Sequence, residues 1–104
     1  MPRPEDVAAV ADRLRLLGDP TRLTICCALM QGETNPGCLA ELAQVAPAAL
    51  SQHLAKLRLG GVVRARREGQ RVWYELADPE VRDLVEHLLA GARLRAAADA
   101  ATPA

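Results

Sequence analysis

The chain has 104 residues, a formal net charge of zero and 50% hydrophobic residues, which suits a single domain over residues 1–104. Trp73 and Tyr74 are its only aromatic residues, so the core has to consist of Leu, Val and Ala side chains, and this composition favours helices. No apolar run has the ~18 residues of a membrane span, and the first residues lack the apolar segment of a signal peptide, so we expect a cytoplasmic protein without membrane contact.

Two amphipathic helices are predicted at the start of the chain. Apolar residues recur every three or four positions over residues 6–17, which is the period of a helix with one buried face, and Gly18 suits its C-terminal end. Asp19 then supplies an N-cap carboxylate, and Pro20 follows at the first helical position, where a missing N–H costs nothing. These signals predict a second helix over residues 20–31.

A helix-turn-helix is predicted next. Asn35 and Pro36 give the same start signal for a short third helix, and Pro47 begins a fourth helix after a tight break. Two short helices separated by such a break are typical of a helix-turn-helix. Leucines line one side of the fourth helix (Leu50, Leu54 and Leu57), and polar residues fall off that stripe (Ser51, Gln52, His53 and Lys56).

A β-hairpin with a basic tip is predicted after the fourth helix. Residues 62–67 and 70–76 have the composition of two strands, and the turn falls at Glu68 and Gly69. The hairpin should lean on the helices through its apolar side chains, because an isolated hairpin is only marginally stable in water. Residues 51–74 carry a net charge of +5 and the rest of the chain carries −5. Although the overall charge of zero argues against nucleic-acid binding, this asymmetry favours contact with DNA through one basic face.

The last helix and the ends of the chain complete the prediction. Asp78 and Pro79 repeat the cap-and-proline signal ahead of helically spaced apolar residues, while the alanine-rich tail has little to pack. We expect frayed ends at about residues 1–5 and 96–104. The fold class is mainly α with a two-stranded β-hairpin wing, in the order four helices, two strands and one helix. The first and last helices would leave apolar stripes in water, which predicts a homodimer through these two helices.

Three short motifs carry a family resemblance. They are LGDPTRL at residues 17–23, LSQHLAKL at residues 50–57 and GQRVWYEL at residues 69–76. In this order and spacing the chain resembles the ArsR/SmtB family of bacterial winged helix-turn-helix repressors over roughly residues 11–89. The resemblance implies a dimeric repressor that binds a palindromic operator and releases it when an inducer binds. Between Ala43 and Ser51 the chain is about three residues shorter than the usual family pattern.

Double-stranded operator DNA is the expected partner. The fourth helix should enter the major groove, because its hydroxyl, amide and imidazole groups can donate or accept at base edges. The arginines of the hairpin would repel one another unless a polyanion is near, so contact with phosphates or the minor groove is expected for them. The predicted DNA-binding residues are Ser51, Gln52, His53, Lys56, Arg64, Arg66, Arg67 and Arg71.

The three cysteines are an odd number for a disulfide framework and suit reduced thiols. Cys26 and Cys27 are adjacent in the second helix, so only one of them can face the core squarely. They are either small core fillers, or thiols that pair under oxidation, or, together with Cys38, ligands for a soft metal ion or arsenite. No cofactor is required, and a thiophilic metal or metalloid would act as an inducer.

Several functions therefore stay open at this point. The first is a DNA-binding transcriptional repressor that releases its operator on thiol modification or thiophilic ligand binding. The second is a winged-helix regulator with structural cysteines and a different inducer, and the third is a protein-interaction module without DNA binding. An enzyme is not expected, because Cys38 with His53 or His87 is the only material for a nucleophile and base, and no acid-orienting pattern accompanies it.

Overall fold

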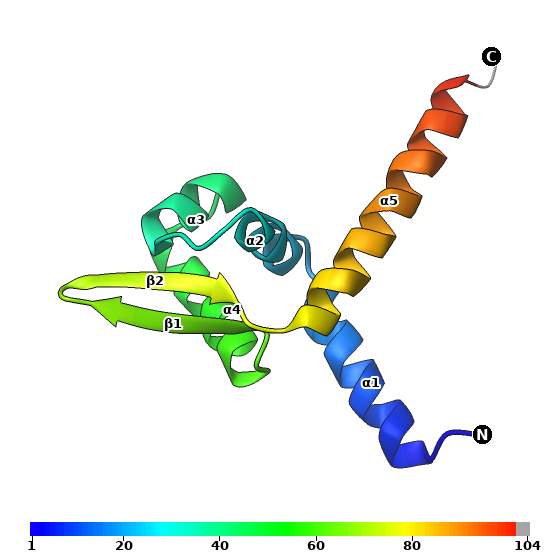
Figure 1. Ribbon diagram of the computed structural model, residues 1–104, viewed down its shortest axis with the longest axis horizontal. Helices are drawn as coiled ribbons and strands as arrows, with labels where there is room; N and C mark the ends of the chain where they lie inside the picture. Colours follow the sequence, from blue (N-terminus) through cyan, green and yellow to red (C-terminus); the bar gives the residue numbers. More distant parts are fainter. Residues whose placement is uncertain (102–104) are drawn as a thin grey trace.

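Every helix of the chain begins at a proline, whose fixed φ and missing N–H suit the first helical turn. Three of these starts have the predicted cap. The side chains of Asp19, Asn35 and Asp78 accept from the backbone N–H groups of Arg22, Cys38 and Glu80, each at 2.9 Å. The computed structural model describes residues 1–101 (Figure 1). Its elements are α1 (Pro4–Leu17), α2 (Pro20–Met30), α3 (Pro36–Ala43), α4 (Pro47–Leu59), β1 (Val63–Glu68), β2 (Arg71–Leu76) and α5 (Pro79–Ala101).

One apolar cluster joins the helices to the base of the hairpin. The leucine stripe of α4 is buried as predicted, and no polar or charged side chain within residues 1–101 is fully buried. Tyr74 and Leu76 of β2 pack against the cluster, so the hairpin leans on the helices. The buried residues of the cluster are Leu17, Ile25, Cys26, Leu29, Leu39, Leu50, Leu54, Leu57, Val62, Val63, Val81 and Val85.

The hairpin is antiparallel and gains a short third segment that the sequence did not indicate. Its register pairs Val63 with Leu76 at the base and Glu68 with Arg71 at the tip. On the free edge of β2, the N–H of Thr34 donates to the carbonyl of Tyr74 at 3.1 Å, and the N–H of Tyr74 donates back at 2.8 Å. The loop between α2 and α3 is thereby attached to the wing.

A left-handed residue closes the turn of the helix-turn-helix. Gln44 has φ 56° and ψ 48°, and the N–H of Val45 donates to the carbonyl of Ala40 at 3.1 Å. This arrangement is a Schellman motif, which ends a helix and reverses the chain within a few residues. The short connection to α4 is therefore sufficient for the two helices to meet.

Helices α1 and α5 project from one side of the molecule, opposite the hairpin, and diverge from each other (Figure 1). The guanidinium of Arg13 ties α1 to the body by donating to the carbonyl of Gly60 and pairing with Asp78. Both helices carry apolar side chains that stay in solvent in the single chain, with Val10 58% and Leu88 55% exposed. Exposure on this scale is unusual for a helix with a regular apolar stripe.

The ends of the elements differ from the prediction by a few residues. Fraying was expected at residues 1–5 and 96–104, whereas α1 begins at Pro4 and α5 continues as a helix to Ala101. Alanine has the highest helix propensity, so the composition of this segment suits the continuation of the helix. The rest of that tail, residues 102–104, lies outside the described residues. No helix in the described part of the chain is long and apolar enough to cross a membrane.

Candidate nucleic-acid interface

The solvent-facing side of α4 holds three of its four predicted DNA-binding residues in the open. Ser51, Gln52 and Lys56 are exposed, because the leucine stripe lies on the opposite side of the helix and packs into the core. Hydroxyl, amide and ammonium groups on a free helix face are able to reach base edges and phosphates in a major groove. The arrangement thus agrees with a recognition helix.

The fourth residue, His53, has partners inside the protein. Its side chain is 24% exposed, and its Nδ1 lies 3.4 Å from an Arg22 nitrogen and 3.8 Å from Oδ2 of Asp19. The hydrogen bond from the backbone N–H of Arg22 lowers the pKa of Asp19, so this carboxylate stays ionised beside the imidazole. His53 is therefore held by the start of α2, a contact that the helical spacing of α4 did not reveal.

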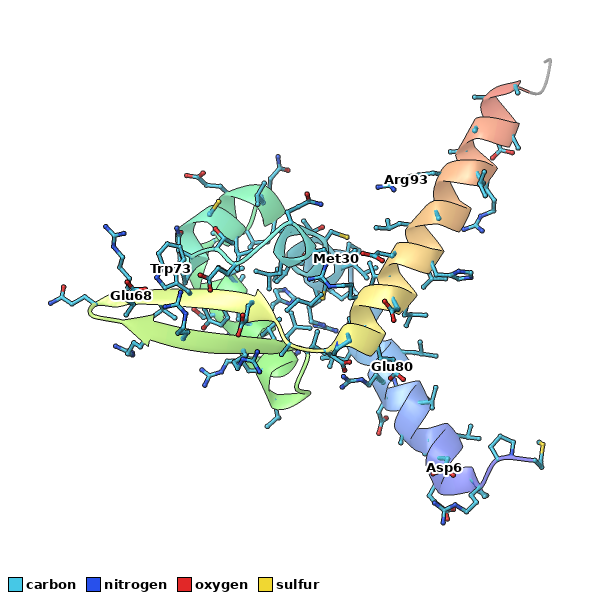
Figure 2. The ribbon with its side chains drawn as sticks, in the orientation of Figure 1. Asp6, Met30, Glu68, Trp73, Glu80 and Arg93 are labelled. Carbon is cyan, nitrogen blue, oxygen red and sulfur yellow. The ribbon has the colours of Figure 1, made fainter. Side chains whose placement is uncertain are left out.

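The four arginines of the hairpin divide between its two faces. Residues paired directly across an antiparallel ladder share one face, and successive residues of a strand alternate. Arg64, Arg66 and Arg71 therefore lie on the face that also holds Trp73, while Arg67 lies on the other face. All four are exposed. Figure 2 shows that the tip, marked by Glu68, extends away from the helices.

Two of these arginines are already paired with acids. Arg64 contacts Glu75 at 2.7 Å, and Arg66 contacts both Glu33 and Glu68 at 2.8 Å. The hydrogen bonds to Glu68 and Glu33 raise the pKa of Arg66 above its ordinary value. Glu68 is the single acid of residues 51–74, and the fold supplies two more acids, because Glu33 comes from a distant loop and Glu75 from the paired strand.

Positive charge is consequently least neutralised at the hairpin tip. Arg67 and Arg71 make no ion pair with any residue of 1–101. An unpaired exposed guanidinium meets a phosphate without first losing an internal partner. These two side chains are the strongest candidates for contact with a nucleic-acid backbone.

The three cysteines lie in three different environments. Cys26 is fully buried in the core, and burial together with the neighbouring Cys27 raises the pKa of its thiol to about 11. Cys27 is half-buried, and Cys38 is exposed on α3. Within the described range, no group of three histidine, cysteine or acidic side chains stands close enough to hold a metal ion. The structure thus does not bring the three thiols together.

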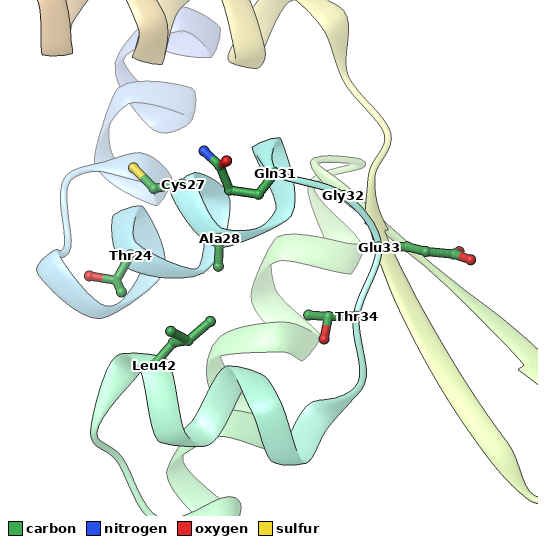
Figure 3. Close-up of a pocket in the computed structure, with 8 residues that line it drawn as sticks. All are labelled: Thr24, Cys27, Ala28, Gln31, Gly32, Glu33, Thr34 and Leu42. Atoms are coloured by element: carbon green, nitrogen blue, oxygen red, sulfur yellow. The ribbon is translucent and has the colours of Figure 1, made fainter.

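Cys27 lines an open cavity of about 460 Å³ between α2, α3 and the loop that joins them (Figure 3). Thr24 and Ala28 of α2, Gln31 at the C-cap of α2 and Leu42 of α3 contribute walls. The same loop supplies the remaining walls and also holds the hairpin, through the bridge to Tyr74 and the ion pair to Arg66. The loop between α2 and α3 therefore connects the cavity at Cys27 to the hairpin.

The comparisons with known proteins agree with this geometry. Residues 19–65 match the family model described as "Bacterial regulatory protein, arsR family". The chain is also 40% identical over 75 residues to the transcriptional activator HlyU of Vibrio cholerae, covering 72% of this chain and 69% of that protein. The chain belongs to the arsR family of bacterial regulatory proteins. The resemblance found in the sequence motifs is confirmed.

Other arsR-type relatives extend the comparison. The HTH-type transcriptional regulator KmtR of Mycobacterium tuberculosis is 40% identical over 85 residues, which cover 81% of this chain and 65% of that protein. The chain thus spans about two thirds of the length of these curated relatives. These relatives are regulators rather than enzymes, which agrees with the expectation from the sequence.

Solved structures confirm the winged helix-turn-helix fold. HlyU from Vibrio cholerae N16961 has a TM-score of 0.76 at 36% identity, covering 83% of this chain and 94% of that chain. The homodimeric winged helix-turn-helix DNA-binding domain of Mb0332 from Mycobacterium bovis, solved by NMR, has a TM-score of 0.71 at 30% identity, covering 88% of each chain.

Proposed function

We propose that the protein is a transcriptional repressor that binds double-stranded operator DNA through α4 and the hairpin. The observation that carries this proposal is the exposed polar side of α4 next to a basic hairpin whose tip arginines lack ion pairs within residues 1–101. Since the arsR family is bacterial, we also propose that the protein works in the cytoplasm, where bacterial chromosomal DNA lies. The proposed contact residues are Ser51, Gln52, His53 and Lys56 of α4, and Arg64, Arg66, Arg67 and Arg71 of the hairpin.

A homodimer through α1 and α5 is part of the proposal. The exposed stripe of α1 includes Val7, Val10 and Leu14, and Leu88 and Leu94 of α5 are also exposed. A second copy would remove these side chains from water and place two recognition helices on the two halves of a palindromic site. The homodimeric Mb0332 domain supports this assembly.

We further propose that a thiol reaction at Cys27 weakens operator binding. Cys26 is an unsuitable target, because a buried thiol with a pKa near 11 has almost no thiolate at neutral pH. Cys27 borders the cavity whose loop holds the hairpin, so an oxidant or a thiophilic metal or metalloid there would displace the wing. Each ~1.4 kcal/mol of preference for the displaced state lowers the competent population tenfold.

Two alternatives predict different results in one experiment. A regulator with structural cysteines would bind the operator but ignore thiol reagents, and a protein-interaction module would show no salt-dependent DNA affinity. The experiment is a mobility-shift assay on the DNA upstream of the protein's own gene, with and without diamide, arsenite, cadmium or zinc. We expect binding by the untreated protein and release by at least one reagent.

Single substitutions decide which thiol acts. Cys27→Ser should bind DNA normally and lose the response, whereas Cys38→Ser, the matched control on the protein surface, should retain it. An unaltered response in Cys27→Ser would end the thiol proposal and leave the DNA-binding proposal intact. Absence of a shifted band at low salt would end the DNA-binding proposal itself.

A further inference from the structure

One arginine joins three helices at the point where α1 ends, α2 begins and α4 passes. The Nε of Arg22 donates to the carbonyl of Leu16 at 2.6 Å, and its Nη2 donates to the carbonyl of Arg15 at 3.5 Å. Both carbonyls belong to the last turn of α1, where four such groups have no partner inside the helix. Two of the donor groups of Arg22 therefore cap α1 and fix the plane of the guanidinium.

The third donor group of this guanidinium faces the recognition helix. Nη1 of Arg22 lies 3.4 Å from Nδ1 of His53, in hydrogen-bonding geometry. Arginine has no acceptor, so it can only donate, and Nδ1 of His53 has to present its lone pair. A neutral imidazole that accepts at Nδ1 carries its proton on Nε2. The contact thereby selects one of the two neutral tautomers.

The neighbouring carboxylate does not compete for that position in the neutral state. Oδ2 of Asp19 accepts from the backbone N–H of Arg22 at 2.9 Å and is farther from Nδ1, at 3.8 Å. A proton on Nδ1 would point at this region while losing the hydrogen bond from Arg22. The guanidinium is held by α1 and α2 together, so it is preorganised as the partner of the imidazole.

We propose that Arg22 is a positioning residue for DNA recognition, which fixes neutral His53 as a donor through Nε2–H. The inference rests on the proposed function, because it assigns a role to His53 within the DNA-contacting side of α4. The Nε2 atom is the ring nitrogen farther from the helix backbone, and the side chain is 24% exposed. Its flanking residues Ser51, Gln52 and Lys56 are exposed on the same helix.

A fixed donor at this position restricts what His53 can read. In the major groove, guanine offers N7 and O6, adenine offers N7 and thymine offers O4 as acceptors, whereas cytosine presents an N4 amino donor. A donor held in place is therefore compatible with an acceptor edge and is left unpaired by cytosine. We expect one position in each half-site to reject cytosine because of the Arg22 contact.

The tautomer can be observed without DNA. The chain has two histidines, so His87→Gln leaves His53 as the only source of imidazole signals. Long-range ¹H–¹⁵N spectra at pH 8 distinguish the protonated ring nitrogen of an imidazole from the unprotonated one. We expect His53 to carry its proton on Nε2, and Arg22→Met to produce a mixture of tautomers. Arg15→Met, which removes an exposed arginine from α1, is the matched control and should leave the spectrum unchanged.

DNA binding supplies the second readout. The amide nitrogen of glutamine can occupy the place of Nε2, and that of asparagine the place of Nδ1. His53→Gln should therefore retain most of the affinity and the rejection of cytosine, while His53→Asn should lose about tenfold per half-site and tolerate cytosine. Arg22→Met should behave like His53→Asn. Arg22→Lys, which keeps a donor, should recover part of the lost affinity and of the rejection of cytosine. This variant remains informative if Arg22→Met is unstable.

The two proposals fail in different ways. A proton on Nδ1 of His53 in the parent protein, or tautomers that are unaffected by both Arg22 substitutions, would overturn the positioning role whether or not DNA binds. Absence of duplex binding by the parent protein at low salt would overturn the proposed function, and the positioning role for DNA recognition would then fall with it.

Discussion

Removal of the two arginines at the hairpin tip measures how much of the DNA affinity comes from phosphate contacts. Arg67 and Arg71 make no ion pair within residues 1–101, so each protomer offers two free guanidinium groups and a dimer twice as many. Each phosphate contact contributes about 0.9 to the slope of log K against log salt concentration. The double variant Arg67→Gln/Arg71→Gln should therefore flatten that slope by about 3 to 4 units.

The change in slope translates into a large change in relative affinity. The parent protein loses affinity with salt more steeply than the double variant. A slope difference of 3 to 4 units therefore lowers the ratio of their DNA affinities about 100-fold between about 50 and 200 mM salt. The assay is fluorescence anisotropy with a labelled duplex from the upstream region, titrated at several salt concentrations. Fitting log K against log salt then gives the slope for each protein directly.

A charge-neutral control separates phosphate contact from damage to the hairpin. Arg64→Gln/Glu75→Gln removes an ion pair at 2.7 Å and leaves the net charge unchanged. Its slope should flatten by less than half as much as that of the tip variant, because the cation that is lost was already neutralised by Glu75 in the free protein. An unchanged slope in the tip variant would refute the reasoning, and so would equal flattening in the control.

Three further substitutions or reactions test the dimer, the thiols and the core. Val10→Asp places a charge on the exposed stripe of α1, so sedimentation should show a monomer, and operator affinity should fall with it. At pH 8, iodoacetamide should modify two of the three cysteines in the folded protein and all three in guanidinium chloride, because the pKa of Cys26 is raised to about 11. Leu39→Ala, at a fully buried site, should lower the free energy of unfolding in urea by about 2 to 5 kcal/mol.

Each of these three experiments has an outcome that would contradict the structural feature it tests. Leu42→Asp, at a site 57% exposed on α3, is the control for Val10→Asp, and monomers in both variants would point to general destabilisation rather than a dimer face. Modification of Cys26 in the folded protein at the rate of the other thiols would contradict its burial. A loss below about 1 kcal/mol for Leu39→Ala would contradict its place in a packed core.

Local signals explain why the order of elements was predictable. The pairs Asp19–Pro20 and Asn35–Pro36 start helices through contacts within three residues, so they act before any tertiary structure exists. The leucine stripe of α4 likewise fixes its buried side by spacing alone. These features locate the helix-turn-helix and its exposed polar residues from the sequence.

Contacts between distant residues were not predictable in the same way. The ion pair between Glu33 and Arg66 and the bridge between Thr34 and Tyr74 join segments more than 30 residues apart, and no periodicity marks them. Adjacent cysteines show only that one of the two faces the core, and the packing of α2 decides that it is Cys26. The counter-charge that Glu33 supplies to Arg66 was not predictable for the same reason, since it comes from a distant loop.

The central claim is that α4 and the hairpin form the DNA-binding face of this protein. Backbone amide NMR during titration with the upstream duplex at low salt tests it most directly. The claim predicts the largest shifts in α4 around Ser51 and Gln52 and in the hairpin turn around Gly69. Shifts confined to α1 and α5, or no shifts at all, would contradict it.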